Sequence, residues 1–206
     1  MTRLVCSWLL CFWMAAPLLA QDRMPPIPAQ KMTDLQRRAA AEFRDARGSD
    51  VSGPFVPLLR SPEVMNRARA MGDYLRFKSV LSPRLSEFVI LLTARAWTQQ
   101  YEWHAHYPLA LKAGLNPETA KAIAEGRRPA KMPEDEETLY DFCDELRRNQ
   151  GVTDATYARM LAKFGEQGII DTTGIVGYYT LLAMVMNTTR TPLPQGENPG
   201  LPLYPH

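Results

Sequence analysis

Residues 82–115 read SPRLSEFVILLTARAWTQQYEWHAHYPLALKAGL, and this stretch decides the fold. Ser82 precedes Pro83, which pairs an N-cap side chain with a proline at the first helical position, where a missing N–H costs nothing. A run of apolar residues follows at 88–92, and Gly114 stands where a later helix should end. The stretch therefore predicts consecutive helices that carry most of their side chains into a core.

Similar start and stop signals recur along the rest of the chain. Thr33 to Gln36 forms a capping-box pattern that Gly48 closes, and Ser61-Pro62 and Asn116-Pro117 repeat the N-cap and proline pair. Further helix ends are expected at Gly126, Gly151 and Gly168. One apolar stripe at helical spacing is formed by Leu139, Phe142, Cys143 and Leu146. No alternating run with hairpin turns interrupts these signals, so the predicted fold class is all-α.

Composition excludes several classes of protein. The chain has 206 residues, is 46% hydrophobic and carries a formal net charge of +2, from 24 basic and 22 acidic residues. That balance offers no polyanion-binding surface, so nucleic acid is not an expected partner. No Gly-rich phosphate loop or multi-cysteine metal cluster is present in the sequence. The remaining classes are a helical enzyme and a helical binding protein.

The two ends differ from the middle of the chain. Residues 1–20 have one positive charge at Arg3 followed by an uncharged apolar run, the layout of a secretory signal peptide. We expect export to the periplasm or secretion, with an uncleaved anchor as the alternative. Residues 21–49 form an N-terminal arm and helix, and 196–206 a proline-rich tail. Signal cleavage would remove Cys6 and Cys11, which leaves Cys143 alone and more typical of core packing than of a reactive thiol.

Residues 169–186 form a long, nearly uncharged helix. Asp171, the threonines and the glycines make a core or subunit-interface helix the better interpretation, so no stable membrane span is expected after signal cleavage. A helix that is apolar on most sides needs more cover than a small domain provides. We therefore expect self-association into a homo-oligomer.

The candidate chemistry lies in the opening stretch. Glu87 and Arg95 sit on an otherwise apolar helix, where charged groups are costly unless they are paired or used. Glu102 and His106 are four residues apart and so share one face of the next helix. A carboxylate beside an imidazole can transfer protons near neutral pH. For Glu87 and Arg95, an ion pair with each other is the alternative interpretation.

Other residues could surround this pair. Gln99 falls one turn before Glu102, and Tyr101 and Trp103 flank it as candidate pocket walls or as ordinary core aromatics. His104 is about 200° from His106 around the helix, so a two-histidine metal site is not expected. No metal and no cofactor are predicted. The expected ligand is a small molecule.

The spacing resembles the carboxymuconolactone decarboxylase family, whose wider superfamily includes the alkylhydroperoxidase D proteins. The family pattern of a glutamate followed at +12, +15 and +19 falls on Glu87, Gln99, Glu102 and His106. In the peroxidase branch the two middle positions form a CxxC pair, so this chain resembles the non-thiol branch. The resemblance covers residues 50–195 and implies an alkylhydroperoxidase D-like bundle of about six to eight helices.

The resemblance implies a lyase or isomerase-type enzyme without redox thiols that acts on a small carboxylated or lactone substrate. On that view Glu87, Glu102 and His106 are catalytic, and Arg95 holds a substrate carboxylate, with Gln99, Tyr101 and Trp103 as further substrate-binding residues. The alternatives are a peroxidase (peroxiredoxin-type) activity and a non-catalytic helical oligomer that binds a small ligand in the same pocket.

Overall fold

The computed structural model describes residues 22–198 and 200–202; the predicted signal peptide lies outside them. Within these residues the chain forms eight α-helices, one short 3-10 helix and no strand, which confirms the all-α prediction. The elements are η1 (Ala29–Lys31), α1 (Asp34–Arg47), α2 (Phe55–Leu58), α3 (Pro62–Phe77), α4 (Pro83–Ala96), α5 (Gln100–Lys112), α6 (Pro117–Ala124), α7 (Glu134–Asn149) and α8 (Asp154–Thr189).

Local capping fixes where several helices start. The Thr33 side chain accepts a hydrogen bond from Gln36 N while the Gln36 side chain accepts from Thr33 N, so the predicted capping box is present. Ser82 accepts from Leu85 N at the start of α4, and Asn116 accepts from Glu118 N at the start of α6. These contacts satisfy N–H groups that a first helical turn leaves free.

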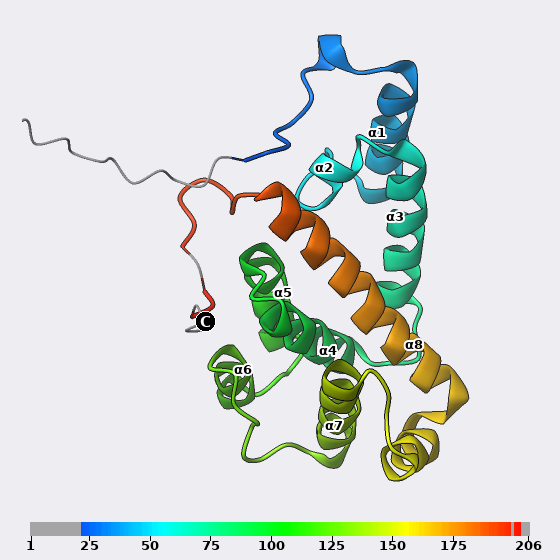
Figure 1. The fold of residues 1–206 in the computed structure, drawn as a ribbon, viewed down its shortest axis with the longest axis vertical. Helices are drawn as coiled ribbons and strands as arrows, with labels where there is room; N and C mark the ends of the chain where they lie inside the picture. The colour runs from blue at the N-terminus through cyan, green and yellow to red at the C-terminus, as the bar shows by residue number, and fades with distance from the viewer. Residues whose placement is uncertain (1–21, 199, 203–206) are drawn as a thin grey trace, which may run out of the picture.

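Helix α4 is the centre of the fold. It packs against α5, α6, α7 and α8, and its residues from Leu85 to Leu91 are all buried. In Figure 1 the long helix α8 crosses the molecule diagonally, with α3 along one side and α6 and α7 at the lower end. Arg84 ties the start of α4 to α7 through ion pairs with Asp135 and Glu136. The core helix therefore has little freedom to shift.

Helix α8 corrects one expectation about helix ends. The helix runs through Gly168, which is buried, and the break lies instead at Gly165, whose φ of 67° and ψ of 179° are not helical. A Cβ built on Gly168 would lie 2.4 Å from the Cβ of Phe164, so close packing accounts for this glycine. Gly114 and Gly126 do take positive φ after α5 and α6, as predicted.

The apolar part of α8 is only partly covered. Among the described helices, α8 is long and apolar enough to cross a membrane by length and composition, and half of its most apolar window is buried inside the molecule. Its Asp171 is satisfied locally, because the carboxylate accepts hydrogen bonds from Val80 N and from the Tyr74 hydroxyl. An acidic residue in this apolar helix thus fixes the turn between α3 and α4.

Candidate active site

A buried pair of acid and base joins the two central helices. His106 Nδ1 on α5 lies 2.7 Å from Glu87 Oε2 on α4, and each residue is 8% exposed. A carboxylate hydrogen-bonded at Nδ1 holds the imidazole in one orientation and selects its tautomer. Glu87 therefore pairs with His106 and not with Arg95, the alternative partner that the sequence left open.

Glu102 lies one turn before His106 on α5, and its environment is unusual for a carboxylate. The residue is 3% exposed, and neither of its carboxylate oxygens has a hydrogen-bond partner among the described residues. Burial raises the pKa of Glu102 well above its ordinary value. The neutral carboxylic acid is therefore favoured, and in that form Glu102 can donate a proton.

Glu102 and His106 line a cavity of about 210 Å³, which we call the Glu102 cavity, whereas Glu87 lies behind His106 and is not one of the lining residues. Its wall contains Tyr101 from α5 and Tyr178 and Tyr179 from α8, and the loop between α1 and α2 closes one side. The Tyr179 and His106 rings meet edge to face, with their centroids 5.0 Å apart. Burial raises the pKa of Tyr178 to about 12, so its phenol stays protonated at neutral pH.

Two glycines let neighbouring backbone approach these tyrosines. A Cβ on Gly53, which has a φ of 56°, would lie 2.7 Å from the Tyr101 ring. A Cβ on Gly72 in α3 would lie 2.3 Å from the Tyr178 hydroxyl oxygen. Both contacts are shorter than any carbon side chain permits. The glycines therefore set the width of the cavity on two sides.

Two arginines that the sequence pattern did not single out also line the cavity. Arg47 at the end of α1 is paired with Asp73, and its guanidinium lies over the Phe55 ring at 5.1 Å. Arg76 in the last turn of α3 has no ion pair among the described residues, and its buried Nε has no hydrogen-bond partner. Arginine is common in a last helical turn, so its position alone carried no functional signal.

Arg95 is not in this cavity, which corrects the predicted substrate anchor. It is buried near the far end of α4, where Nη1 donates to the Pro202 carbonyl oxygen at 2.5 Å, and it lines a different cavity. Eight residues of helix separate it from Glu87, which corresponds to about 12 Å along the axis. The two side chains therefore serve opposite ends of the helix.

Gln99 and Trp103 also lie outside the Glu102 cavity. The Gln99 side chain caps α5 by accepting from Tyr101 N at 2.7 Å and donates to Asn187 Oδ1 at 2.8 Å. Trp103 is buried against Tyr107, with ring centroids 5.6 Å apart. Trp103 follows Glu102 directly on α5, but it is not among the residues that line the Glu102 cavity. Both positions have a structural role in this region.

Cys143 is buried on α7, and burial raises the pKa of its thiol to about 12. It is the one cysteine in the described part of the chain. Within the described residues, no group of three or more His, Cys, Asp or Glu side chains is arranged to hold a metal ion. The residues that line the Glu102 cavity supply carboxyl, imidazole, phenol and guanidinium groups.

Comparison with known proteins shows a family and a fold to which this chain is similar. Residues 62–134 match the model of the Carboxymuconolactone decarboxylase family, and no curated protein sequence matches significantly. An alkylhydroperoxidase AhpD core protein from Ralstonia eutropha JMP134, described as an uncharacterized peroxidase-related protein, superposes with a TM-score of 0.67. Its sequence is 20% identical, and the alignment covers 84% of this chain and 92% of that one.

Two other solved structures have the same fold. A peroxidase-related protein from Silicibacter sp. TM1040 gives a TM-score of 0.68 at 17% identity, over 88% of this chain and 96% of that one. A debrominase in complex with 2,3,4-tribromopyrrole gives a TM-score of 0.64 at 11% identity, and the alignment covers 85% of this chain and 94% of that one. The segment that contains Glu87, Glu102 and His106 therefore belongs to the carboxymuconolactone decarboxylase family, in a chain with the AhpD-like helical fold.

Proposed function

We propose that this protein is an acid/base enzyme of the lyase or isomerase type that acts on a small carboxylated or lactone substrate without redox thiols. The observation that carries the proposal is the buried, unpartnered carboxyl group of Glu102 beside the Glu87–His106 pair. An unpartnered buried carboxyl group costs stability, so its presence in a cavity favours a functional role.

The cavity offers each group that a decarboxylation needs. The bond to the leaving carboxylate breaks, its electron pair moves onto the lactone carbonyl oxygen, and carbon dioxide departs. Glu102, held as the neutral acid, then donates its proton to carbon as the electron pair returns from that oxygen. His106, held in orientation by Glu87, returns a proton from solvent to Glu102. Overall, one carboxylate is replaced by one hydrogen.

Arg76 replaces Arg95 as the candidate for holding an anion. Its guanidinium lines the Glu102 cavity, and a second carboxylate of the substrate would supply the partner that Arg76 lacks among the described residues. The neutral phenols of Tyr178 and Tyr179 can donate hydrogen bonds to an oxygen that gains negative charge. An isomerisation would use the same groups, with His106 removing a proton and Glu102 delivering one.

Thiol chemistry has less support. The sequence has no CxxC pair, and the Cys143 thiol is buried with a raised pKa, so little thiolate forms at neutral pH. The peroxidase-related proteins share the fold at no more than 20% identity, which says nothing of this chain's reaction. A protein that only binds a small ligand in the cavity is the other alternative, and the experiment below separates it from an enzyme.

The test is deuterium incorporation. Purified protein is incubated in deuterated water with a panel of small carboxylated lactones and carboxylic acids, and proton NMR follows each compound. An acid/base enzyme places deuterium on substrate or product carbon. Glu102→Gln keeps the shape but cannot donate the proton, so turnover should fall by ~10²–10⁴-fold. Glu118→Gln, an exposed carboxylate on α6, is the matched control and should turn over normally.

A double variant sharpens the test. Adding His106→Asn to Glu102→Gln should cost little more, because groups that act as a unit are non-additive. A compound that binds but is never labelled would show a ligand-binding protein. Hydroperoxide consumption that disappears in Cys143→Ala would show the peroxidase alternative. Either result would overturn the proposal.

A further inference from the structure

A second and larger cavity, of about 500 Å³, lies on the other side of the central helices. We call it the arginine-rimmed cavity. Val176 and Thr180 of α8 face it, whereas Tyr178 and Tyr179 of the same helix line the Glu102 cavity. Residues two positions apart on a helix point about 200° apart, so the two cavities lie on different faces of α8. The acid/base chemistry proposed above makes no use of the second cavity.

The inner wall of the arginine-rimmed cavity is mainly apolar, and the buried Arg95 of α4 also lines it. Leu92 on α4, Ile123 on α6, Leu146 on α7 and Val176 on α8 contribute to it. Trp97 stands at one side, where its indole N–H donates to Thr180 Oγ1 at 3.1 Å and so holds the ring in place. A cavity of this size and lining fits a small organic molecule with a flat apolar body.

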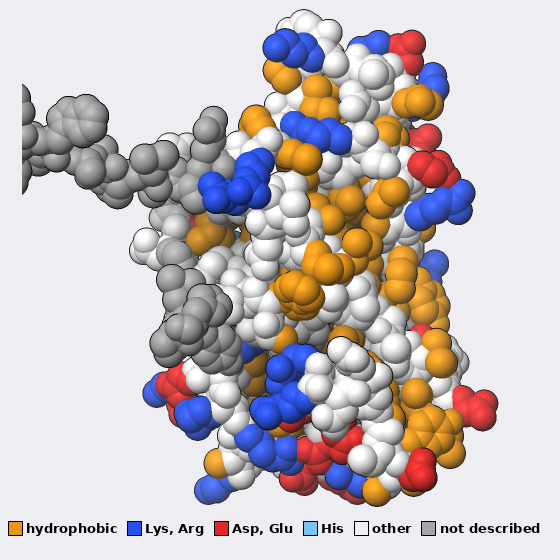
Figure 2. Space-filling view, in the orientation of Figure 1, with side chains coloured by type: hydrophobic (Ala, Val, Ile, Leu, Met, Phe, Trp, Pro, Cys, Tyr) orange, Lys and Arg blue, Asp and Glu red, His pale blue; other side chains and the backbone are white. Residues whose placement is uncertain are grey.

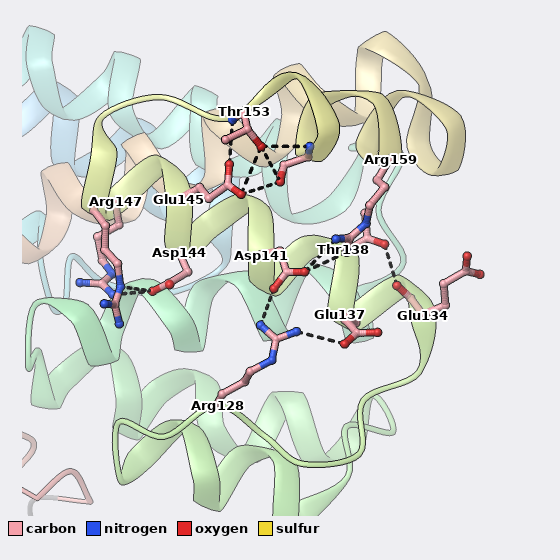
Figure 3. A network of polar contacts seen from close by, with 12 residues as sticks. Arg128, Glu134, Glu137, Thr138, Asp141, Asp144, Glu145, Arg147, Thr153 and Arg159 are labelled. Carbon is pink, nitrogen blue, oxygen red and sulfur yellow. Dashed lines mark hydrogen bonds and ion pairs between the residues drawn. The ribbon is translucent and has the colours of Figure 1, made fainter.

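The rim is positively charged. Arg127, Arg147 and Arg148 line it together with the carboxylate of Asp144. Arg147 Nη2 and Arg148 Nε both donate to the same oxygen, Asp144 Oδ1, at 2.6 and 2.9 Å. Figure 3 shows the Arg147 side chain reaching Asp144. One carboxylate cannot neutralise two guanidinium groups, so this part of the rim keeps an excess positive charge.

The surroundings do not cancel that charge. Figure 2 shows Lys and Arg side chains gathered between the positions of α6 and α7. Arg127 is paired with Glu125, and Arg128 and Arg159 outside the cavity take both oxygens of Asp141. The carboxylates of this region thus already have basic partners. An anion that enters beside Arg147 and Arg148 meets unshared N–H donors.

We infer that the arginine-rimmed cavity is a second ligand site, for a small apolar or aromatic molecule that carries one carboxylate-like group. The apolar body would lie against Val176 and Leu146, and the anionic group would be held by Arg147 and Arg148. Guanidinium groups bind carboxylates through two parallel hydrogen bonds, which favours this class of ligand over neutral apolar compounds.

The test uses 1-naphthoate and its neutral analogue 1-naphthylmethanol with the full-length protein, measured by isothermal titration calorimetry. We expect 1-naphthoate to bind and the alcohol to bind at least about tenfold more weakly. Arg147→Gln/Arg148→Gln should weaken 1-naphthoate by about five- to tenfold. Arg37→Gln/Arg38→Gln removes two exposed charges from α1, away from the cavity, and its affinity should match the unmodified protein.

Filling the cavity tests the apolar half of the site. Val176→Trp fills the cavity from α8 and Leu146→Trp fills it from α7. Circular dichroism shows whether each variant folds, and if one does not, the other still tests binding. Each should abolish 1-naphthoate binding. Binding lost in Arg76→Gln but kept in Arg147→Gln/Arg148→Gln would place the ligand in the Glu102 cavity and overturn the inference. Equal affinity for acid and alcohol would overturn it as well.

Discussion

At the scale of single residues, Glu102 links function to stability through its protonation. Burial raises its pKa above the ordinary value of 4.5, whereas in the unfolded chain it ionises near that value. As pH rises above about 4.5, the unfolded state therefore loses a proton that the folded state keeps, and the free energy of unfolding falls. This loss continues until pH reaches the raised pKa of the folded state.

Glu102→Gln should remove that loss. We expect the variant to gain stability over the unmodified protein as pH rises from 4 to 7, by about 1.4 kcal/mol for each pH unit above the unfolded-state pKa of Glu102 and below its raised folded-state pKa. Urea unfolding at pH 4, 5.5 and 7 measures the difference. A difference that does not change with pH would mean that Glu102 ionises normally in the folded protein.

Substitutions of Arg76 and of Arg95 should have opposite effects on substrate affinity and on stability. Arg76 lines the Glu102 cavity, so Arg76→Gln should raise KM for an anionic substrate by about tenfold, as expected for one lost charge-assisted hydrogen bond. Arg95 donates to the Pro202 carbonyl at the other end of α4, so Arg95→Gln should lower Tm and leave KM unchanged. Steady-state kinetics and thermal unfolding of both variants check this, and the reverse pattern would restore Arg95 as the anchor.

At the scale of helices, two glycines in helical positions should respond oppositely to alanine. Alanine favours a helix by about 1 kcal/mol over glycine. At Gly177 on α8 a new Cβ meets no atom within 4 Å, so Gly177→Ala should raise Tm by about 2–4 °C. At Gly72 on α3 it would meet the buried Tyr178 ring, so Gly72→Ala should cost about 1–3 kcal/mol through overpacking.

Calorimetry of the two alanine variants provides the measurement, and turnover adds a second readout. Because Tyr178 lines the Glu102 cavity, Gly72→Ala should also lower activity, whereas Gly177→Ala should not. A stable and fully active Gly72→Ala protein would show that Tyr178 can move aside, and that α3 does not set the width of the cavity.

At the scale of the whole molecule, exposed apolar side chains lie along α3 and α8. Phe77 and Ile170 are each 68% exposed, and Val80 in the turn between α3 and α4 is 50% exposed. Figure 2 shows hydrophobic side chains along the line of α8 and α3. Patches of this kind mark interaction sites. We propose that this face packs against a second copy of the chain, as the sequence of α8 predicted.

Sedimentation velocity tests this assembly. The unmodified protein should sediment as an oligomer at micromolar concentration, and Ile170→Lys should shift it toward the monomer because a charge would be buried at the contact. Lys163→Ala, an exposed residue on the N-terminal part of α8, serves as the control and should leave the assembly intact. A stable monomer in the unmodified protein would remove the proposal.

The sequence by itself determined the helical fold and the three groups at the centre of the site. Helix caps at Thr33, Ser82 and Asn116 are contacts within a few residues, so the local pattern suffices to predict them. Glu102 and His106 share a helix, and a resemblance in spacing added Glu87. Even so, the position of the break in α8 could not be predicted, because the tight contact of Gly168 with Phe164 is a matter of packing.

Only the tertiary structure decided which charges face one another. It paired His106 with Glu87, left Glu102 without a partner, moved Arg95 to another cavity and brought Arg76 from α3 into the site. Each of these facts depends on the register and crossing of helices that are distant in the chain. Helical periodicity fixes the direction of a side chain about its own axis, but the packing of side chains between helices decides what it meets there.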